Sequence, residues 1–260
     1  MCFLFRCLLL WAFTAGAADT LRIAADPNNL PFSNDKGEGF ENKIAQVIAR
    51  DLQMQIEYRW RAQRRGFFRE TLKEGDCDLV LGVPTGFERA LTTKPYYRAS
   101  YVLVYRKDRG IALKSLDDPD LRTLPVGVQL IGDDGANTPP AHALAARNIV
   151  TNIVGFTVYG DYSQPNPPLR ILDAVVNRQI DVAVVWGPPA GYFAKKHEGA
   201  LEIVPLGADT RLEWLPMTFN ISIGVKRSKK ELRDKLNAVL ERRRPEIEQI
   251  LEEYGIPRAH

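Results

Sequence analysis

The alternation of strand-like and helix-like segments constrains the fold of this chain more than any other feature. Apolar strand patterns occupy residues 21–25, 56–60 and 77–83, and residues 44–52 carry apolar side chains at helical spacing between the first two. Strands that alternate with helices are typical of parallel sheets with helical crossovers. This part of the chain therefore predicts an α/β unit.

A second α/β series follows the first. Its expected strands and helices are, in order, residues 124–129, 141–147, 153–159, 169–177, 180–186 and 189–196. Two further strand patterns, at 100–105 and 219–225, connect the two series. They predict two lobes joined by two crossing segments, with a central cleft, an arrangement that allows hinge closure around a ligand.

The expected domain limits follow from these connections. Residues 19–106 and 217–260 are predicted to form lobe 1, and residues 107–216 are predicted to form lobe 2. In the last helical region Ser228 and Glu231 have the spacing of a capping box. Pro245 is expected to restart that helix and Gly255 to stop it.

The first 18 residues are typical of a secretory signal peptide. Arg6 precedes an apolar run, 7–13, and small residues at 15–17 fit signal peptidase. Its removal takes away Arg6 and lowers the formal net charge from +3 to +2, which argues against general binding to nucleic acid. No other segment is long and apolar enough to span a membrane. A soluble protein outside the cytoplasm, in the periplasm, is therefore expected.

Cysteine and histidine usage gives little support to catalysis or metal binding. The mature chain retains one cysteine, Cys77, which excludes an internal disulfide and lies on an apolar strand where a thiol is usually inert. His142, His197 and His260 are scattered, with no zinc-binding spacing. We therefore expect no metal and no cofactor.

Four motifs resemble the extracellular solute-binding proteins that serve polar amino acids. They are Gly39-Phe40-Glu41, the strand approach at 74–80, the segment 87–97 with its Glu88-Arg89 pair, and the ending at 254–256. The resemblance covers nearly the whole mature chain. It implies the two-lobed α/β fold of a type II periplasmic binding protein, with a central cleft and two crossing segments.

Seven longer motifs carry a narrower resemblance. They read DPNNLPFSN, GEGFENKIA, QRRGFFRETL, PYYRASYV, GVQLIGDDGANTPPAHAL, VYGDYSQPNPP and DVAVVWGPPAGYFA. Together they resemble the periplasmic binding-like proteins encoded beside quinoprotein (pyrroloquinoline quinone) alcohol and methanol dehydrogenases. That resemblance implies a role in assembly or activation of the dehydrogenase, with the dehydrogenase and its cytochrome c as partners.

Two alternatives stay open beside this interpretation. One is a carrier that feeds a small polar solute to an ABC transporter. The other is a periplasmic enzyme on the same scaffold, in which Asp133, Asp134 and Asp161 share a pocket and shift one another's pKa.

The chain departs from the amino-acid binders at two places. Arg89 stands where those proteins pair an arginine with the ligand carboxylate, and its planar fork suits that task. The segment 185–189, however, has no acid to hold an ammonium group beside Trp186. Asp133 and Asp134 replace the usual hydroxyl-bearing turn and would repel a carboxylate. A cleft without amino-acid specificity is therefore predicted.

The loop at 131–140 matches neither an EF-hand nor a P-loop. Asn137 or Thr138 is expected to cap the helix that begins with Pro139 and Pro140. Loops beyond the carboxyl ends of strands usually line a cleft. We therefore expect this loop to form one acidic wall, shaped for a protein partner.

Two more segments are candidates for contact with a guest. The basic and aromatic run at 59–69 is expected at the cleft rim, because it follows a strand and precedes a helix. It is a candidate partner surface because Arg, Trp and Phe are enriched in interfaces. The stiff loop at 158–168 is rich in Tyr and Pro. The full set of expected contact residues is Asn28, Asn29, Phe32, Arg64, Arg65, Phe67, Arg89, Asp133, Asp134, Asn137, Tyr159, Asp161, Tyr162 and Trp186.

Overall fold

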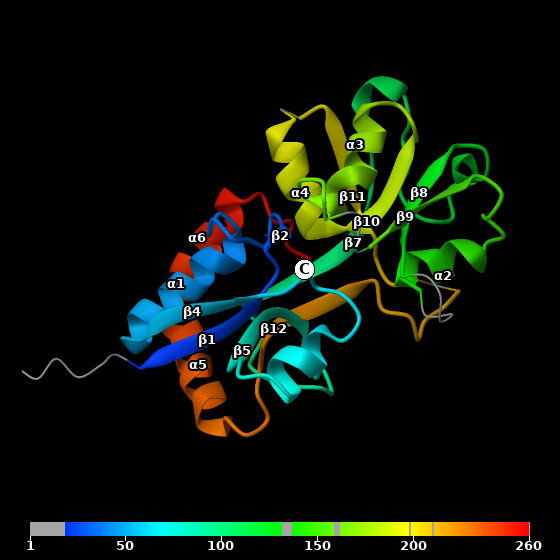
Figure 1. Ribbon diagram of the computed structural model, residues 1–260. Helices are drawn as coiled ribbons and strands as arrows, with labels where there is room; N and C mark the ends of the chain where they lie inside the picture. The colour runs from blue at the N-terminus through cyan, green and yellow to red at the C-terminus, as the bar shows by residue number, and fades with distance from the viewer. Residues whose placement is uncertain (1–18, 132–136, 159–161, 198, 210, 260) are drawn as a thin grey trace, which may run out of the picture.

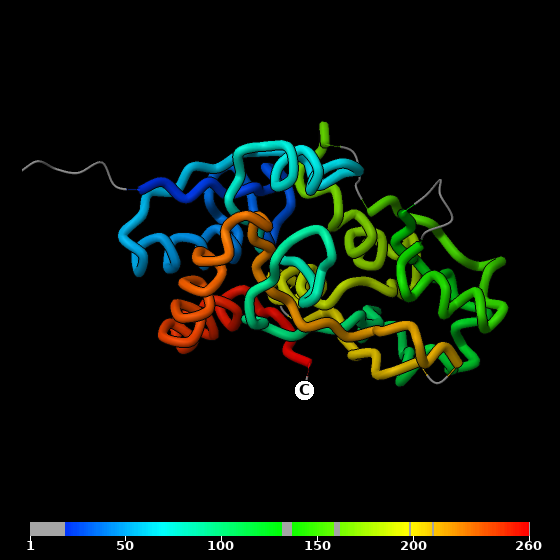
Figure 2. Tube along the Cα trace, turned by 90° about the horizontal axis from the view of Figure 1, so that it is seen from below, coloured from blue at the N-terminus to red at the C-terminus, as the bar shows by residue number. Residues whose placement is uncertain are grey.

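The computed structural model describes residues 19–131, 137–158, 162–197, 199–209 and 211–259. The expected signal peptide lies outside these residues, as do four expected contact residues, Asp133, Asp134, Tyr159 and Asp161. Two lobes lie side by side along the long dimension of the molecule (Figures 1 and 2). This arrangement confirms the predicted α/β fold class.

Lobe 1 is built on a mixed sheet. Strand β1 (Thr20–Ala25) pairs in parallel with β4 (Gln55–Trp60) on one side and with β5 (Leu79–Pro84) on the other. Strand β12 (Thr218–Val225) pairs antiparallel with β5 and brings the end of the chain back into this sheet.

Helices cover one face of the lobe 1 sheet: α1 (Phe40–Leu52), α5 (Lys230–Arg242) and α6 (Arg244–Glu253). Alternation along β1 turns Leu21 and Ile23 toward these helices, where they join the largest buried cluster. The opposite face carries a smaller cluster under a short π-helix, Arg69–Lys73. Three helices therefore cover one face of the lobe 1 sheet, whereas the short π-helix lies over the other, which we call the thinly covered face.

Lobe 2 repeats the α/β arrangement. Strands β9 (Ile153–Thr157), β8 (Val126–Leu130) and β10 (Val182–Trp186) are parallel neighbours in that order. Helices α2 (Pro139–Ala145), α3 (Arg170–Val176) and α4 (Gly187–Lys196) connect and cover them. A further strand, β11 (Leu201–Pro205), was not expected from the sequence and pairs with β7 (Tyr97–Arg106).

The long strand β7 joins the two lobes. Its first residues, from Tyr97 to Ser100, pair with β12, and the following residues, from Tyr101 onward, pair with β10 and β11. One continuous sheet thus runs through both lobes, and β7 and β12 are the two crossing segments. The predicted domain limits, close to the ends of β7 and β12, stay a prediction.

The short elements are the strands β2 (Asn28–Asn29), β3 (Ser33–Asn34) and β6 (Leu91–Thr92) and the 3-10 turns Lys107–Arg109, Pro119–Arg122 and Pro167–Leu169.

The tail of the chain packs against α4 of lobe 2. Tyr254 stacks on Tyr192 with ring centroids 6.0 Å apart, and a Cβ at Gly191 would lie 2.0 Å from the carbonyl oxygen of Gly255. Gly191 is therefore required for this close approach, and Gly255, with φ +67°, ends the helical region as expected. The expected capping box is wrong: Lys229 is the N-cap of α5, and no side chain caps it.

Candidate functional site

Two loops of lobe 1 meet one segment of lobe 2 directly, and we call this contact the seam. The Asn28 side chain donates to the carbonyl of Gln164 at 2.8 Å and accepts from the backbone N–H of Asn166 at 2.8 Å. The backbone N–H of Leu30 donates to Asn166 Oδ1 at 3.4 Å. Hydrogen bonds between side chains and backbone groups therefore join the lobes without an intervening molecule.

Asp26 organises the lobe 1 side of the seam. Its buried carboxylate accepts the backbone N–H groups of Asn28 at 2.9 Å and Gln63 at 2.7 Å, together with the hydroxyl of Tyr162 from lobe 2. Burial, followed by the hydrogen bond to Asp26, raises the pKa of Tyr162 well above its usual value. Tyr162 therefore stays a neutral donor.

A cation–π contact completes the seam. The Arg64 guanidinium carbon lies 4.6 Å from the centre of the Tyr162 ring. Asn29 donates from its side chain to Gln63 Oε1 at 3.3 Å, within lobe 1. The structure thus places four expected contact residues at or beside the seam, Asn28, Asn29, Arg64 and Tyr162, where each already has a partner within the chain. Their role in binding a guest stays a prediction.

Sequence reasoning missed four residues of the seam: Asp26, Gln63, Gln164 and Asn166. Two of them have a local signal. Asp26 precedes Pro27 at the end of β1, where Asp commonly binds the backbone two residues further on. Asn166 precedes Pro167 and has φ +48°, a conformation that Asn tolerates better than most residues. Neither signal reveals the partner across the seam.

Aromatic rings fill the crossing region beneath the seam. Trp186 is half-buried, and its ring centroid lies 5.1 Å from that of Tyr101 on β7 and 5.8 Å from that of Phe219 on β12. All three strands that carry these rings run through the junction of the lobes. Trp186 therefore packs against both crossing strands, and its expected role in binding a guest stays a prediction.

Three other expected contact residues contact groups of their own lobe. Phe32 lies against Phe40 of the lobe 1 core, with ring centroids 5.4 Å apart. Phe67 is 3 % exposed, so its ring packs beneath the sheet and is absent from the rim where we expected it. Asn137 Oδ1 accepts the backbone N–H of Ile131 at 3.2 Å, which ties the two ends of the loop together.

Thr138 is the N-cap residue of α2, and Pro139 and Pro140 occupy its first turn, as expected. The Thr138 hydroxyl does not cap the helix, however. It donates to the carbonyl of Gln129 at 2.7 Å and so anchors the helix start to β8.

Arg89 lies apart from the seam, in a groove on the thinly covered face of lobe 1. The groove has a volume of about 690 Å³ and also contains Arg65. Arg89 is exposed and has no hydrogen bond or ion pair among the described residues. The sequence named Arg65 and Arg89 among the expected contacts of the cleft, whereas the structure places both in a groove beside the π-helix. Their role in binding a guest stays a prediction.

Glu41 is the most perturbed carboxyl group of lobe 1. Although the residue as a whole is only half-buried, its carboxyl is enclosed: a Cβ at Gly82 would lie 2.4 Å from Glu41 Oε1. Burial raises the pKa of Glu41 to about 8, against a weaker opposing hydrogen bond from Tyr96 at 3.5 Å. No cation is paired with this carboxyl among the described residues. The Glu41 carboxyl is therefore largely protonated, and uncharged, at neutral pH.

Cys77 is buried and free, and burial raises its thiol pKa to about 11. Both findings agree with the expected inert thiol. The described residues contain no cluster of three or more His, Cys, Asp or Glu side chains that would hold a metal ion. Within the same residues, the helices are too short or too polar to cross a membrane.

Comparison with known proteins agrees with this geometry. Residues 21–256 match the family of bacterial extracellular solute-binding proteins, family 3. A protein named MoxJ from Methylorubrum extorquens is 28% identical over 246 residues, which cover 92% of this chain and 82% of the relative. The resemblance inferred from the motifs is confirmed by this match.

Two solved structures are similar over the same span. The crystal structure of the periplasmic binding protein XoxJ from Methylobacterium extorquens AM1 is 36% identical, with a TM-score of 0.75 over 92% of this chain and 99% of that one. The crystal structure of MxaJ from Methlophaga aminisulfidivorans MPT is 26% identical, with a TM-score of 0.77 over 92% and 100%.

Proposed function

The chain belongs to family 3 of the bacterial extracellular solute-binding proteins, and we propose that it serves a quinoprotein methanol or alcohol dehydrogenase in the periplasm. The observation that carries this proposal is the similarity to MoxJ, XoxJ and MxaJ along more than nine-tenths of the chain. Seven sequence motifs spread over both lobes carry a resemblance to proteins of the same kind. In this role the protein binds the dehydrogenase, or a segment of it, and assists assembly or activation.

The seam supports a protein guest over a free amino acid. An amino-acid site needs a cationic group for the carboxylate and an acid for the ammonium. Arg89 lies in the groove, away from the seam, and the segment 185–189 contains no acid. The polar side chains of the seam already have partners in the opposite lobe. A protein segment that competes for these hydrogen bonds would open the lobes around itself.

The test is capture of the dehydrogenase by the mature protein. Immobilised protein is exposed to purified dehydrogenase with and without its quinone, and to the partner cytochrome c, in separate experiments. We expect saturable binding of the dehydrogenase, stronger for the form without quinone because an assembly factor acts before the cofactor is in place. Absence of binding to both forms of the enzyme contradicts the proposal.

A carrier for a small polar solute is the alternative function. A ligand present at 100 times its dissociation constant adds about 2.7 kcal/mol to the free energy of unfolding. A thermal-shift screen of amino acids, polyamines and small organic acids detects such a ligand directly. A stabilising solute combined with no dehydrogenase binding would favour the carrier.

A further inference from the structure

The groove on lobe 1 is lined by six cations. We call it the basic groove. Its lining consists of Arg65, Gly66, Phe68, Arg69, Leu72, Lys73, Arg89, Lys226, Arg227 and Ser228. No acidic residue belongs to this lining. Like charges gathered along one groove repel one another, so such an arrangement favours a negatively charged occupant.

The π-helix supplies one wall of the basic groove. The backbone N–H of Glu74 donates to the carbonyl of Arg69 at 2.8 Å, five residues back, which is the hydrogen bond that defines the wide π turn. Arg69 and Lys73 are the first and last residues of this π-helix, Arg65 precedes it, and all three line the groove.

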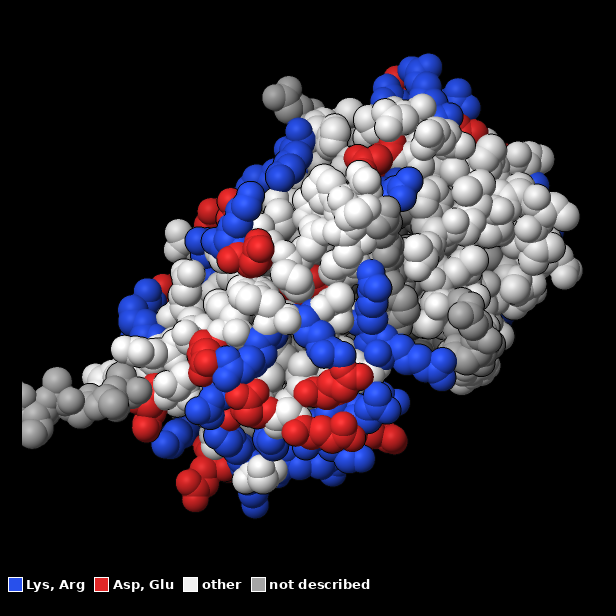
Figure 3. Space-filling view, in the orientation of Figure 1, with Lys and Arg blue, Asp and Glu red and all other residues white. Residues whose placement is uncertain are grey.

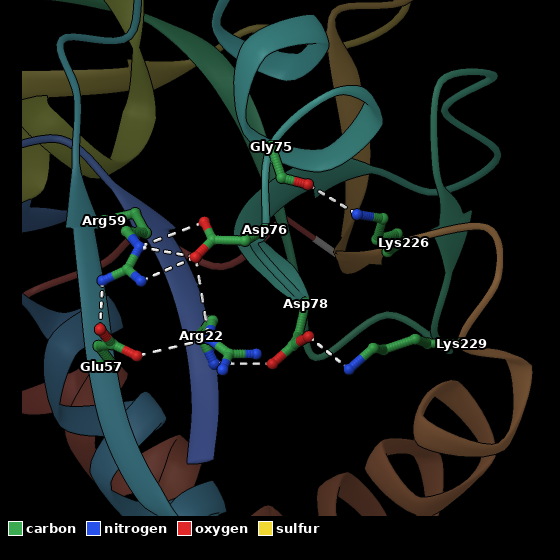
Figure 4. A network of polar contacts seen from close by, with 8 residues as sticks. All are labelled: Arg22, Glu57, Arg59, Gly75, Asp76, Asp78, Lys226 and Lys229. Carbon is green, nitrogen blue, oxygen red and sulfur yellow. Dashed lines mark hydrogen bonds and ion pairs between the residues drawn. The ribbon is translucent and has the colours of Figure 1, made fainter.

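The opposite wall is held rigidly by polar contacts (Figure 4). Lys226 donates to the carbonyl of Gly75 at 2.7 Å, and Lys229 pairs with Asp78 at 2.5 Å. Asp78 also accepts the backbone N–H of Arg22 at 2.8 Å. These contacts fasten the connection between β12 and α5 to the strands, so the wall is formed before any ligand arrives.

Apolar side chains form the floor. Leu72 is buried, and the half-buried Phe68 ring lies 4.6 Å from the ring of Phe87, centre to centre. A groove with charged walls and an apolar floor fits a chain that offers both carboxylates and apolar side chains. A compact inorganic anion would use one group of converging cations and leave the floor unused.

Some of the cations already have partners, and two have none. Arg69 approaches Glu70 at 3.1 Å and Glu74 at 3.9 Å, while Arg227 donates to the carbonyl of Glu88. Lys73 and Arg89 are exposed and have no ion pair or side-chain hydrogen bond among the described residues. These two side chains line the groove and are available to a ligand.

We propose that the basic groove is a docking site for an extended acidic segment of a partner protein, one that alternates carboxylate and apolar side chains. The proposal deepens the proposed function, on which it rests for the identity of that partner. Charge complementarity across the groove would orient the partner and speed its association. The groove and the lobe 1 side of the seam belong to the same lobe, and Arg65 of the groove follows Arg64 of the seam in the chain. A partner docked on the groove would therefore reach the seam with a neighbouring segment.

The experiment uses the mature chain and a defined probe. The probe is a fluorescein-labelled eight-residue peptide of alternating glutamate and leucine, followed by fluorescence anisotropy at low ionic strength. A peptide with lysine in place of glutamate is the charge control. The groove variant is Lys73→Glu with Arg89→Glu, and the matched variant is Lys36→Glu with Arg98→Glu, which makes the same charge change at exposed sites of lobe 1 outside the groove.

We expect the acidic peptide to bind the wild-type chain. Its affinity for the groove variant should be at least tenfold lower, and its affinity for the matched variant should stay within about threefold of wild type. The affinity should fall as salt is added, since exposed charges are screened. Equal affinity for the groove and matched variants overturns the proposal. So does displacement of the peptide by inorganic phosphate or by a short oligonucleotide at a lower concentration than the peptide itself.

A second arm separates this inference from the proposed function. Both variants are tested for capture of the dehydrogenase. If the peptide binds only through the groove and none of the protein variants captures the dehydrogenase, the groove is an acidic-segment site but the dehydrogenase is not its partner. If the groove variant captures the dehydrogenase as well as wild type does, the groove is not part of that interface. Circular dichroism and the unfolding midpoint establish that each variant is folded.

Discussion

Two carboxyl groups, one in each lobe, are both shielded from water, but their pKa values are shifted in opposite directions. In lobe 2, the Asp209 side chain is 1% exposed and accepts from Arg147 Nη1 at 2.7 Å. It also accepts the backbone N–H groups of Arg211 at 2.8 Å and Leu212 at 2.9 Å. Burial opposes ionisation of Asp209, but these hydrogen bonds outweigh it and lower its pKa.

In lobe 1, the Glu41 carboxyl has no cation beside it and a pKa of about 8. The cations of this lobe are at its surface instead: Figure 3 shows charged side chains of both signs crowded over lobe 1, whereas the face of lobe 2 turned to the viewer is largely uncharged. The comparison teaches that burial by itself leaves a carboxyl neutral, and that only a built-in set of donors keeps it charged.

Removal of the buried cation in lobe 2 should have the largest effect. Arg147→Met leaves Asp209 charged and buried without its partner, which costs about 3–5 kcal/mol of unfolding free energy at neutral pH. Chemical denaturation measures the loss. Arg147→Met combined with Asp209→Leu should recover most of it, because no charge is then left uncompensated. A single variant as stable as wild type would mean that water reaches Asp209.

The Glu41 carboxyl should give lobe 1 the opposite pH dependence. Its pKa rises from 4.5 to about 8 on folding, so the folded state binds more protons between these values. Its contribution to stability is present at low pH and is lost as the pH rises toward 8. Glu41→Gln removes this loss, so the variant should gain stability relative to wild type from pH 5 to pH 9.

Unfolding free energies at both pH values provide the measurement for Glu41. The Asp209 carboxyl works in the other direction, since its lowered pKa makes its contribution disappear as the pH falls below its ordinary value. Asp209→Asn should therefore be less stable than wild type at neutral pH, and this difference in unfolding free energy should shrink as the pH falls. Parallel pH profiles for wild type and Glu41→Gln would show that the Glu41 carboxyl is hydrated.

The seam joins the two lobes and should give an intermediate effect. Tyr162→Phe removes the hydroxyl that Asp26 accepts and should cost about 1 kcal/mol. Hydrogen exchange at the backbone N–H groups of Asn28 and Gln63 should accelerate, because the same carboxylate holds them. Tyr192→Phe, also in lobe 2, is the matched control because no described group bonds its hydroxyl. Identical exchange in both variants would place Tyr162 outside the seam in solution.

The exposed ion pairs of lobe 1 should have the smallest effect. Arg59 contacts Asp76 at 2.7 Å, with 39% and 56% of the two side chains exposed. Water and salt screen such a pair, so Arg59→Gln should leave the unfolding midpoint unchanged within error. A loss comparable with that of Arg147→Met would show that Arg22, Glu57, Arg59 and Asp76 act as one coupled network.

The sequence by itself determined the order of elements and the family. Strand and helix periodicity reflects contacts within a few residues, so the two α/β series, the crossing strands β7 and β12 and the restart of the last helix at Pro245 were all predictable. Strand β11 was not predicted, because its five residues, LEIVP, include a charge and a proline and their apolar pattern is too short. A helix over residues 67–73 was predictable from the sequence, but its π form at Arg69–Lys73 was not, because those hydrogen bonds depend on how the segment fits over the sheet.

Only the tertiary structure decided what the candidate residues touch. Asp26 and Tyr162 lie 136 positions apart, and Arg147 and Asp209 lie 62 apart, so no local pattern connects them. The sequence identified Asn28, Arg64 and Tyr162 as contact residues because their types suit recognition. It could not tell that Asn28 would bond residues of the opposite lobe or that Arg64 would lie over the Tyr162 ring. Likewise Arg89 carried a family motif, but the packing of the π-helix and the connection at 226–228 placed it in the basic groove. Partners chosen across the chain depend on packing, which residue types constrain but do not specify.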